Sequence, residues 1–408
     1  MKTFVLALCA SSAASPAMAQ EWTRFRGPNG SGVSESKNVP VKWGESEILW
    51  KVAIPGPSHS QPVIWGERLF LCGAKDDGRE RSIHCLRKDD GRELWSRKLP
   101  SQTHGKHKLN SFASSSPTVD AERVYAAFVD PEHFVVKAWD HAGKELWSVD
   151  LGPFKSQHGH GASPILHDDK LIVTNDQDGA SFVAALDAKT GRMAWKSPRR
   201  NTDQSTAYST PILLERPGAA PELLTSSGVH GLSSLDPRTG RVNWEARVFD
   251  KRAVSSPVLA GNLVVGTCGQ GGSGTLYAVK LGGRGDVTSS HLAYQVKTAA
   301  PYVPTPVALG DRLFLVSDKG VASCVEAGTG RVIWSERIGG EYYCSPVLAE
   351  GRVYVNSTAG ETVVFQASES FSLLARNPLG EGSHTAPVID GGRLYLKTFN
   401  HLLCVGTP

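Results

Sequence analysis

Histidine is the residue type whose placement in this chain most suggests chemistry. Six of the 13 histidines lie in short stretches that precede a recurring proline, and neutral imidazole is a frequent ligand of transition metals. On an extended backbone, His158-Gly159-His160 would direct both rings to one side. One hypothesis is that these histidines bind a metal ion. The alternative is a hydrated polar funnel with unligated histidines, and we favour this alternative because no metal-specific spacing motif is present. The candidate metal ligands are His59, His158, His160 and His384.

Aromatic residues stand at equivalent places before other prolines. A tyrosine ring can stack on a sugar or a quinone, although a tyrosine at such a place can equally be a partly buried packing residue. The predicted cofactor-binding residues are His59, Tyr208, Tyr302, Tyr343 and His384. The chain contains no G-x-S-x-G motif, so it gives no support to a serine hydrolase. No catalytic residue is assigned.

The recurring proline belongs to a unit that is written eight times. Each unit opens with a small residue before the proline and continues into short β-rich stretches. Five copies then end in a glycine turn followed by Trp, and in three of these the turn is Thr-Gly. The prolines are Pro62, Pro117, Pro164, Pro211, Pro257, Pro306, Pro346 and Pro387, which are 40 to 55 residues apart. A period in the forties with four short strands per unit is typical of β-propeller blades. We predict an all-β chain, a single eight-bladed β-propeller with four antiparallel strands per blade.

The last blade is incomplete at the end of the chain. It starts at 384 and reaches only its third strand, 401–405, before the sequence stops. Residues 48–54 have the character of the missing outermost strand, so we expect an N-terminal strand to close the ring within a propeller spanning 48–408. Closure removes the two sheet edges that an open array would expose. The stretches before the eight prolines would then meet around one axial mouth.

The segments before the propeller have two different characters. Residues 1–19 are typical of an export signal, with Lys2, an apolar core and Ala17-Met18-Ala19 as the cleavage site. Residues 20–47 contain three large aromatic side chains, and we expect an arm lying on the propeller. No stretch approaches the length of a transmembrane segment, and no lipid-attachment cysteine is convincing. We therefore expect an exported protein, periplasmic or secreted.

Charge and cysteine usage exclude two further classes of protein. The formal net charge is only +4 and the basic residues are scattered, so the basic stripe that nucleic acid requires is missing. Six cysteines follow the signal, and three of them share one position of the third strand, where other blades have Ala or Ser. They are best explained as small packing residues rather than as a disulfide framework.

Two units resemble the tryptophan-docking repeat of the quinoprotein alcohol dehydrogenase superfamily. They run from Ala185 to Trp195 and from Ser234 to Trp244, and the likeness extends over nearly all of the chain after the signal. The resemblance implies an eight-bladed fold. For a dehydrogenase of this superfamily, the resemblance would also imply pyrroloquinoline quinone bound on the axis beside Ca²⁺, and a disulfide between adjacent cysteines. No such cysteine pair and no C-x-x-C-H haem motif occurs here. Other similar proteins are outer-membrane assembly lipoproteins, which use the propeller as a scaffold.

These observations favour a non-catalytic binding or protein-interaction scaffold. Its partner would be an envelope protein or a small ligand at the axial mouth, and we expect a monomer. One alternative is a quinoprotein-type oxidoreductase that binds pyrroloquinoline quinone at the mouth. Another is a carbohydrate-binding or metal-dependent enzyme that uses the histidine-rich sector. Fold, by itself, does not decide among these functions.

Overall fold

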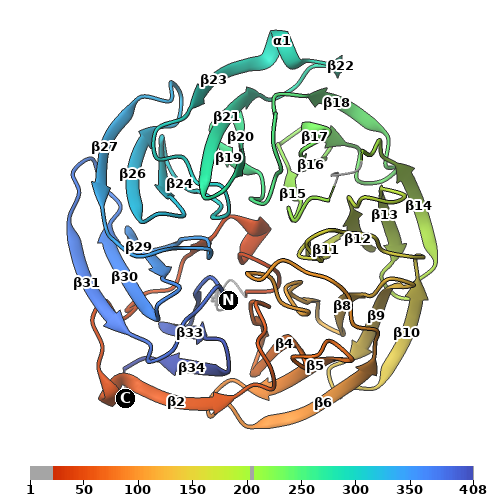
Figure 1. The fold of residues 1–408 in the computed structure, drawn as a ribbon, viewed down its shortest axis with the longest axis vertical. Helices are drawn as coiled ribbons and strands as arrows, with labels where there is room; N and C mark the ends of the chain where they lie inside the picture. The colour runs from red at the N-terminus through yellow and green to blue at the C-terminus, as the bar shows by residue number, and fades with distance from the viewer. Residues whose placement is uncertain (1–21, 203–205, 408) are drawn as a thin grey trace, which may run out of the picture.

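The computed structural model describes residues 22–202 and 206–407, which form a closed ring of eight β-sheets around one axis (Figure 1). Each sheet contains four antiparallel strands that follow one another from the axis to the rim, and two sheets gain one extra short strand. The predicted all-β, eight-bladed propeller is confirmed. The predicted signal segment 1–19 lies outside the described residues. Within them, no helix is long and apolar enough to cross a membrane.

The blades are numbered from the N-terminus, and strands are given from the axis outward. Blade one contains β3 (Val63–Trp65), β4 (Arg68–Ala74), β5 (Glu80–Arg87) and β6 (Glu93–Pro100), and blade two contains β7 (Thr118–Val119), β8 (Arg123–Val129), β9 (Phe134–Asp140) and β10 (Glu145–Asp150). Blade three contains β11 (Ile165–His167), β12 (Lys170–Asn175), β13 (Phe182–Asp187) and β14 (Met193–Pro198), and blade four contains β15 (Ile212–Leu214), β16 (Glu222–Ser227), β17 (Gly231–Leu235) and β18 (Val242–Ala246). Blade five contains β19 (Val258–Ala260), β20 (Leu263–Gln270), β21 (Ser273–Lys280) and β23 (Leu292–Val296), and blade six contains β24 (Val307–Leu309), β25 (Arg312–Val316), β26 (Val321–Glu326) and β27 (Val332–Arg337). Blade seven contains β28 (Val347–Ala349), β29 (Arg352–Asn356), β30 (Glu361–Gln366) and β31 (Leu373–Pro378), and blade eight contains β32 (Val388–Asp390), β33 (Arg393–Lys397), β34 (His401–Val405) and β2 (Ile48–Ala53). The short elements outside this plan are η1 (Pro28–Gly30), β1 (Val33–Ser34), η2 (Glu45–Glu47), β22 (Gly285–Asp286) and α1 (Thr288–His291).

The N-terminal strand β2 closes the ring by pairing antiparallel with β34, as predicted. Trp50 lies opposite Cys404, and Ala53 lies opposite His401. In Figure 1 the strands β2 and β34 lie side by side in this one blade. The last blade therefore contains strands from both ends of the chain, which ties them together without a covalent bond.

Neighbouring blades are joined at the rim by tryptophan docking. The indole of Trp147 donates a hydrogen bond to the carbonyl of Ala188 in the next blade, at 3.0 Å. It packs on Gly191, whose φ is +72° and where an added Cβ would lie 2.7 Å from the indole. The same ring-on-glycine contact joins Trp50 to Gly91, Trp95 to Gly143, Trp195 to Gly240 and Tyr294 to Gly330. The glycine of the turn and the aromatic residue therefore recur together, because the ring of one blade packs directly on the glycine of the next.

Blade five lacks the Thr-Gly turn, and the contact at its boundary with blade four changes accordingly. The indole of Trp244 donates instead to Glu222 of its own blade, at 3.1 Å. The insertion that replaces the turn adds β22 to the outer edge of β18 in parallel orientation. The segment 282–286, which departs from the repeat, thus covers the outer edge of the blade-four sheet.

Hydroxyl groups join the inner strands around the axis. Six blades have Ser or Thr directly before the recurring proline. Each of these hydroxyls accepts a hydrogen bond from the backbone N–H of the equivalent residue in the preceding blade, at 2.9–3.0 Å. These residues are Ser116, Ser163, Thr210, Ser256, Thr305 and Ser345. Blade eight has Ala386 there, and the side-chain amide of Gln61 bridges the gap by donating to the carbonyls of Ala386 and Pro387.

The stretch before β2 crosses the axial channel (Figure 1). Its backbone or side chains bond the inner parts of blades one, two, four, six, seven and eight. The guanidinium of Arg26 is fully buried there and donates to the carbonyls of Thr305, Pro306 and Pro346. These contacts lie at the residue directly before each proline, at the proline itself or after it in the inner strand. The arm therefore occupies the end of the channel opposite the loops that precede the prolines.

Candidate functional site

The loops that precede the inner strands surround two adjacent cavities, which we call the axial mouth. The larger cavity, of about 480 Å³, is lined by residues from blades two to seven, among them Tyr208, Arg252, Tyr302 and Tyr343. The second, of about 440 Å³, is lined mainly from blades one, two, seven and eight, and includes His59, His384 and Phe399. All five residues predicted to bind a cofactor therefore line the mouth, three tyrosines in one cavity and two histidines in the other.

One long connection, residues 101–116, separates the two cavities. Leu109 and Asn110 line both of them. The side-chain amide of Asn110 donates to the backbone carbonyls of His158 and His160, at 2.8 and 3.2 Å, so the loop is tied to the next blade. The 55-residue spacing between the first two prolines is the sequence signal of this insertion, but it does not show that the loop lies over the axis.

His59 and His384 form a pair in the second cavity. Their ring centroids are 4.7 Å apart, and His384 also contacts Phe399 and Tyr343 at 5.0 and 5.2 Å. Burial lowers the pKa of His384 to about 4. Burial, followed by the positive charges of His384 and Lys397, lowers the pKa of His59 well below its ordinary value. Both imidazoles are therefore neutral at neutral pH.

The other two predicted metal ligands lie elsewhere. His160 is 9% exposed and packs between Phe134 and Phe154, each 5.4 Å from its ring, and burial lowers its pKa to about 4. His158 instead pairs with His107, at 5.1 Å, beside the larger cavity. Across residues 22–202 and 206–407, no three His, Cys, Asp or Glu side chains form a group that could hold a metal ion. The sequence places the four histidines on neighbouring loops, but the tertiary packing brings only His59 and His384 together.

Arg252 is the mouth residue that the sequence analysis missed. It lines the 480 Å³ cavity of the mouth and also an adjoining hollow outside the mouth, which is larger, at about 700 Å³. Its Nε is buried without a hydrogen-bond partner, and no carboxylate of the described residues forms an ion pair with it. Its only signal in the sequence was a basic pair, Lys251-Arg252, five residues before Pro257, a place where the other units share no residue type.

Carboxylates at the mouth are few and already engaged. Asp318 accepts hydrogen bonds from the backbone N–H groups of Tyr302 and Val303, at 2.7 and 3.2 Å, and burial raises its pKa. Asp76 lies in the other cavity. A calcium ion with a quinone needs several oxygen ligands that converge on one point. The described mouth residues do not offer such a set, so they do not fit the calcium–quinone group of the dehydrogenases.

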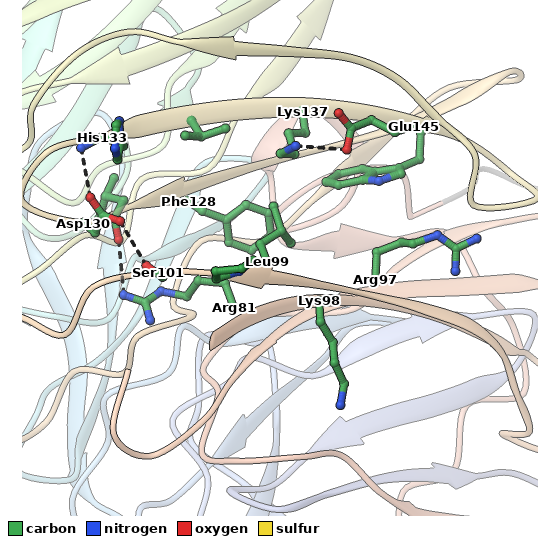
Figure 2. A pocket seen from close by; sticks show the side chains of 14 residues that line it. Arg81, Arg97, Lys98, Leu99, Ser101, Phe128, Asp130, His133, Lys137 and Glu145 are labelled. Atoms are coloured by element: carbon green, nitrogen blue, oxygen red, sulfur yellow. Dashed lines mark hydrogen bonds and ion pairs between the residues drawn. The ribbon is translucent and has the colours of Figure 1, made fainter. Parts of the chain in front are cut away.

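A further hollow lies between blades one and two, away from the axis (Figure 2). Its volume is about 310 Å³, and several charged side chains line it. Lys137 pairs with Glu145 at 2.9 Å, and Arg81 donates to the backbone carbonyls of Gly78 and Val129. Figure 2 shows Phe128 pointing into the space between these groups. Because Lys137 and the terminal nitrogens of Arg81 already have partners within the protein, the axial mouth is the better candidate site.

Comparison with known proteins agrees with this architecture. The family model PQQ_2, described as outer membrane protein assembly factor BamB, matches residues 41–281 and 272–400. Proteins of that name are similar in sequence: the one from Yersinia pestis is 24% identical over 277 residues, 64% of this chain and 66% of the relative. The one from Legionella pneumophila is 27% identical over 172 residues, 40% of each chain. The matches thus span less than two thirds of either relative.

Solved structures show the same fold at low sequence identity. BamB from Moraxella catarrhalis superposes with a TM-score of 0.62 at 15% identity, covering 87% of this chain and 96% of the other. The quinohemoprotein alcohol dehydrogenase ADHIIG from Pseudomonas putida HK5 superposes with a TM-score of 0.67 at 12% identity, covering 96% and 81%. BamB and a quinohemoprotein alcohol dehydrogenase therefore share this architecture, and only the site can separate their functions.

Proposed function

Because this chain belongs to the PQQ_2 family of the outer membrane protein assembly factor BamB, we propose that it is a non-catalytic interaction scaffold of the cell envelope. The export signal predicted from residues 1–19 supports an extracytoplasmic location. The protein acts as a monomer, and its partner is another envelope protein that binds at the axial mouth. The names of the two sequence relatives, both assembly factors, support this role.

One observation carries the proposal. The arm fills one end of the channel, which leaves a concave mouth at the other end, lined by three tyrosines, an arginine and paired histidines. Tyrosine and arginine are enriched among the residues that contribute most binding energy at protein interfaces. A rigid ring of eight blades positions these side chains from loops that are distant in sequence. Such a surface suits binding, and its donor set does not fit the quinone chemistry of the dehydrogenases.

Site-specific photo-cross-linking in the native envelope tests this proposal. A photoreactive amino acid would replace Tyr343 in the mouth, or Leu94, which is 40% exposed on the outer strand of blade one. We expect one discrete adduct with an envelope protein from position 343 and none from position 94. Equal adducts from both positions, or none from the mouth, would contradict the proposal.

A further inference from the structure

The charges around the axial mouth are unbalanced. Arg252 has no carboxylate partner among the described residues, and the Asp318 carboxylate in the same cavity is held by two backbone N–H groups. The second cavity has Lys106 and Lys108 against Asp76 alone. The backbone of Arg252 is fixed, because its carbonyl accepts a hydrogen bond from Gly269 at 3.0 Å. Arg252, Lys106 and Lys108 stand against Asp318 and Asp76, so the mouth has one more positive than negative side chain, and the backbone that carries the Arg252 guanidinium is fixed.

The histidines of the mouth lie beside these positive groups. The pKa of His158 is lowered, first by burial and then by the charge of Arg252 and of His107. The pKa of His59 is lowered by burial and by the charges of His384, Lys397 and Lys106. Burial is the larger cause of each shift, and the positive groups nearby add to it. An anion bound there would oppose these shifts.

The walls of the larger cavity are aromatic. Tyr302 and Arg252 line the same cavity; burial raises the pKa of Tyr302, and the neighbouring guanidinium of Arg252 opposes this rise. Tyr208 and Tyr343 complete the tyrosine lining of the cavity. A single guanidinium between aromatic rings recognises a carboxylate with an apolar neighbour. A polyphosphate or nucleic acid would require many more cations along its path.

We propose, on the basis of the proposed scaffold function, that the axial mouth binds an acidic, extended segment of the partner polypeptide. A Glu or Asp carboxylate of that segment accepts hydrogen bonds from the Arg252 guanidinium, and an adjacent aromatic side chain packs against Tyr208 and Tyr302. Leu109 and Asn110, which line both cavities, lead the segment toward Lys106 and Lys108. The ligand class is therefore an acidic peptide with aromatic residues between its carboxylates.

Fluorescence anisotropy with a labelled synthetic peptide, Gly-Phe-Glu-Phe-Glu-Gly with blocked ends, tests the proposal on the full chain. We expect saturable binding that weakens about tenfold or more in Arg252→Gln, because a charge-assisted hydrogen bond is lost. Arg252→Lys should bind with intermediate strength, since it keeps the charge without the planar fork. The matched control is Arg284→Gln, which removes the same charge from an exposed turn of blade five and should bind like the unaltered protein.

A second peptide, in which Gln replaces both Glu residues, separates charge from shape. We expect it to bind at least about tenfold more weakly to the unaltered protein and to be insensitive to Arg252→Gln. Equal binding of the two peptides, or no binding of either, overturns the inference. If cross-linking at position 343 still captures a partner in that case, the scaffold function stands and only the acidic-segment assignment falls. Full displacement by an equal concentration of N-acetylglutamate would also overturn it, because the ligand would then be a small carboxylate.

Discussion

His160 is a buried packing residue with a neutral ring. Two phenylalanines flank it, and its Nε2 is buried without a partner. A ring so placed cannot readily become charged, since burial disfavours the cation. Residue type alone suggested a metal ligand, whereas the surroundings of the residue make it part of the core.

Acid should therefore weaken the fold through His160. Its pKa falls from an ordinary 6.5 to about 4 in the folded chain, so the unfolded chain binds more protons between these values. Stability is then lost as pH falls through this window. Replacing His160 by Phe should reduce the loss of unfolding free energy between about pH 7.5 and pH 5 by about 2 kcal/mol. Urea unfolding at both pH values measures this.

The control for this experiment is His133, which is half-exposed and hydrogen-bonded to Asp150 at 2.6 Å. This bond raises its pKa, so its contribution is present at low pH and is lost as pH rises. His133→Phe should therefore change the pH dependence in the opposite sense. An unchanged slope in His160→Phe would show that this ring does not resist protonation.

At the scale of the blade, the recurring aromatic and Thr-Gly signals are two halves of one contact. The indole of one blade covers the glycine of the next and bonds a carbonyl of the same turn, as Trp147 does with Gly191 and Ala188. Where blade five loses the turn, Trp244 bonds within its own blade and a short strand covers the edge. The repeat therefore encodes the joint between blades as well as the blade itself.

Gly191→Ala should disrupt such a joint. The new Cβ would lie 2.7 Å from the Trp147 indole, at a φ of +72°. We expect a loss of unfolding free energy of about 3 kcal/mol, from backbone strain and displacement of the ring. Gly261→Ala separates these causes, because φ there is +59° and nothing lies within 4 Å of the added Cβ. That control should lose only about 1 kcal/mol, and equal losses in chemical denaturation would refute the docking explanation.

At the scale of the whole molecule, the N-terminal segment has two structural roles. Strand β2 closes the last blade, and the preceding arm fills one end of the channel. Arg26 is central to the second role, because its guanidinium bonds carbonyls of blades six and seven. Burial lowers its pKa to about 9, so it remains charged at neutral pH.

Arg26→Ala should loosen the arm. It leaves the carbonyls of Thr305, Pro306 and Pro346 without this donor in a buried place. We expect the unfolding free energy to fall by about 3–5 kcal/mol. Limited proteolysis should cut the arm before the propeller, and Arg26→Lys should be intermediate. Equal protease resistance of Arg26→Ala and the unaltered chain would show that the arm is held by other contacts.

The sequence by itself determined the number of blades, their strands and the closure by residues 48–54, because these depend on a local pattern that each unit repeats. It also identified the loops that form the mouth, since every inner strand begins at its proline. Only the tertiary structure decided which side chains meet there. Arg252 follows no repeat and His160 turns into the core, because loop paths and packing between blades depend on contacts between residues far apart in the chain.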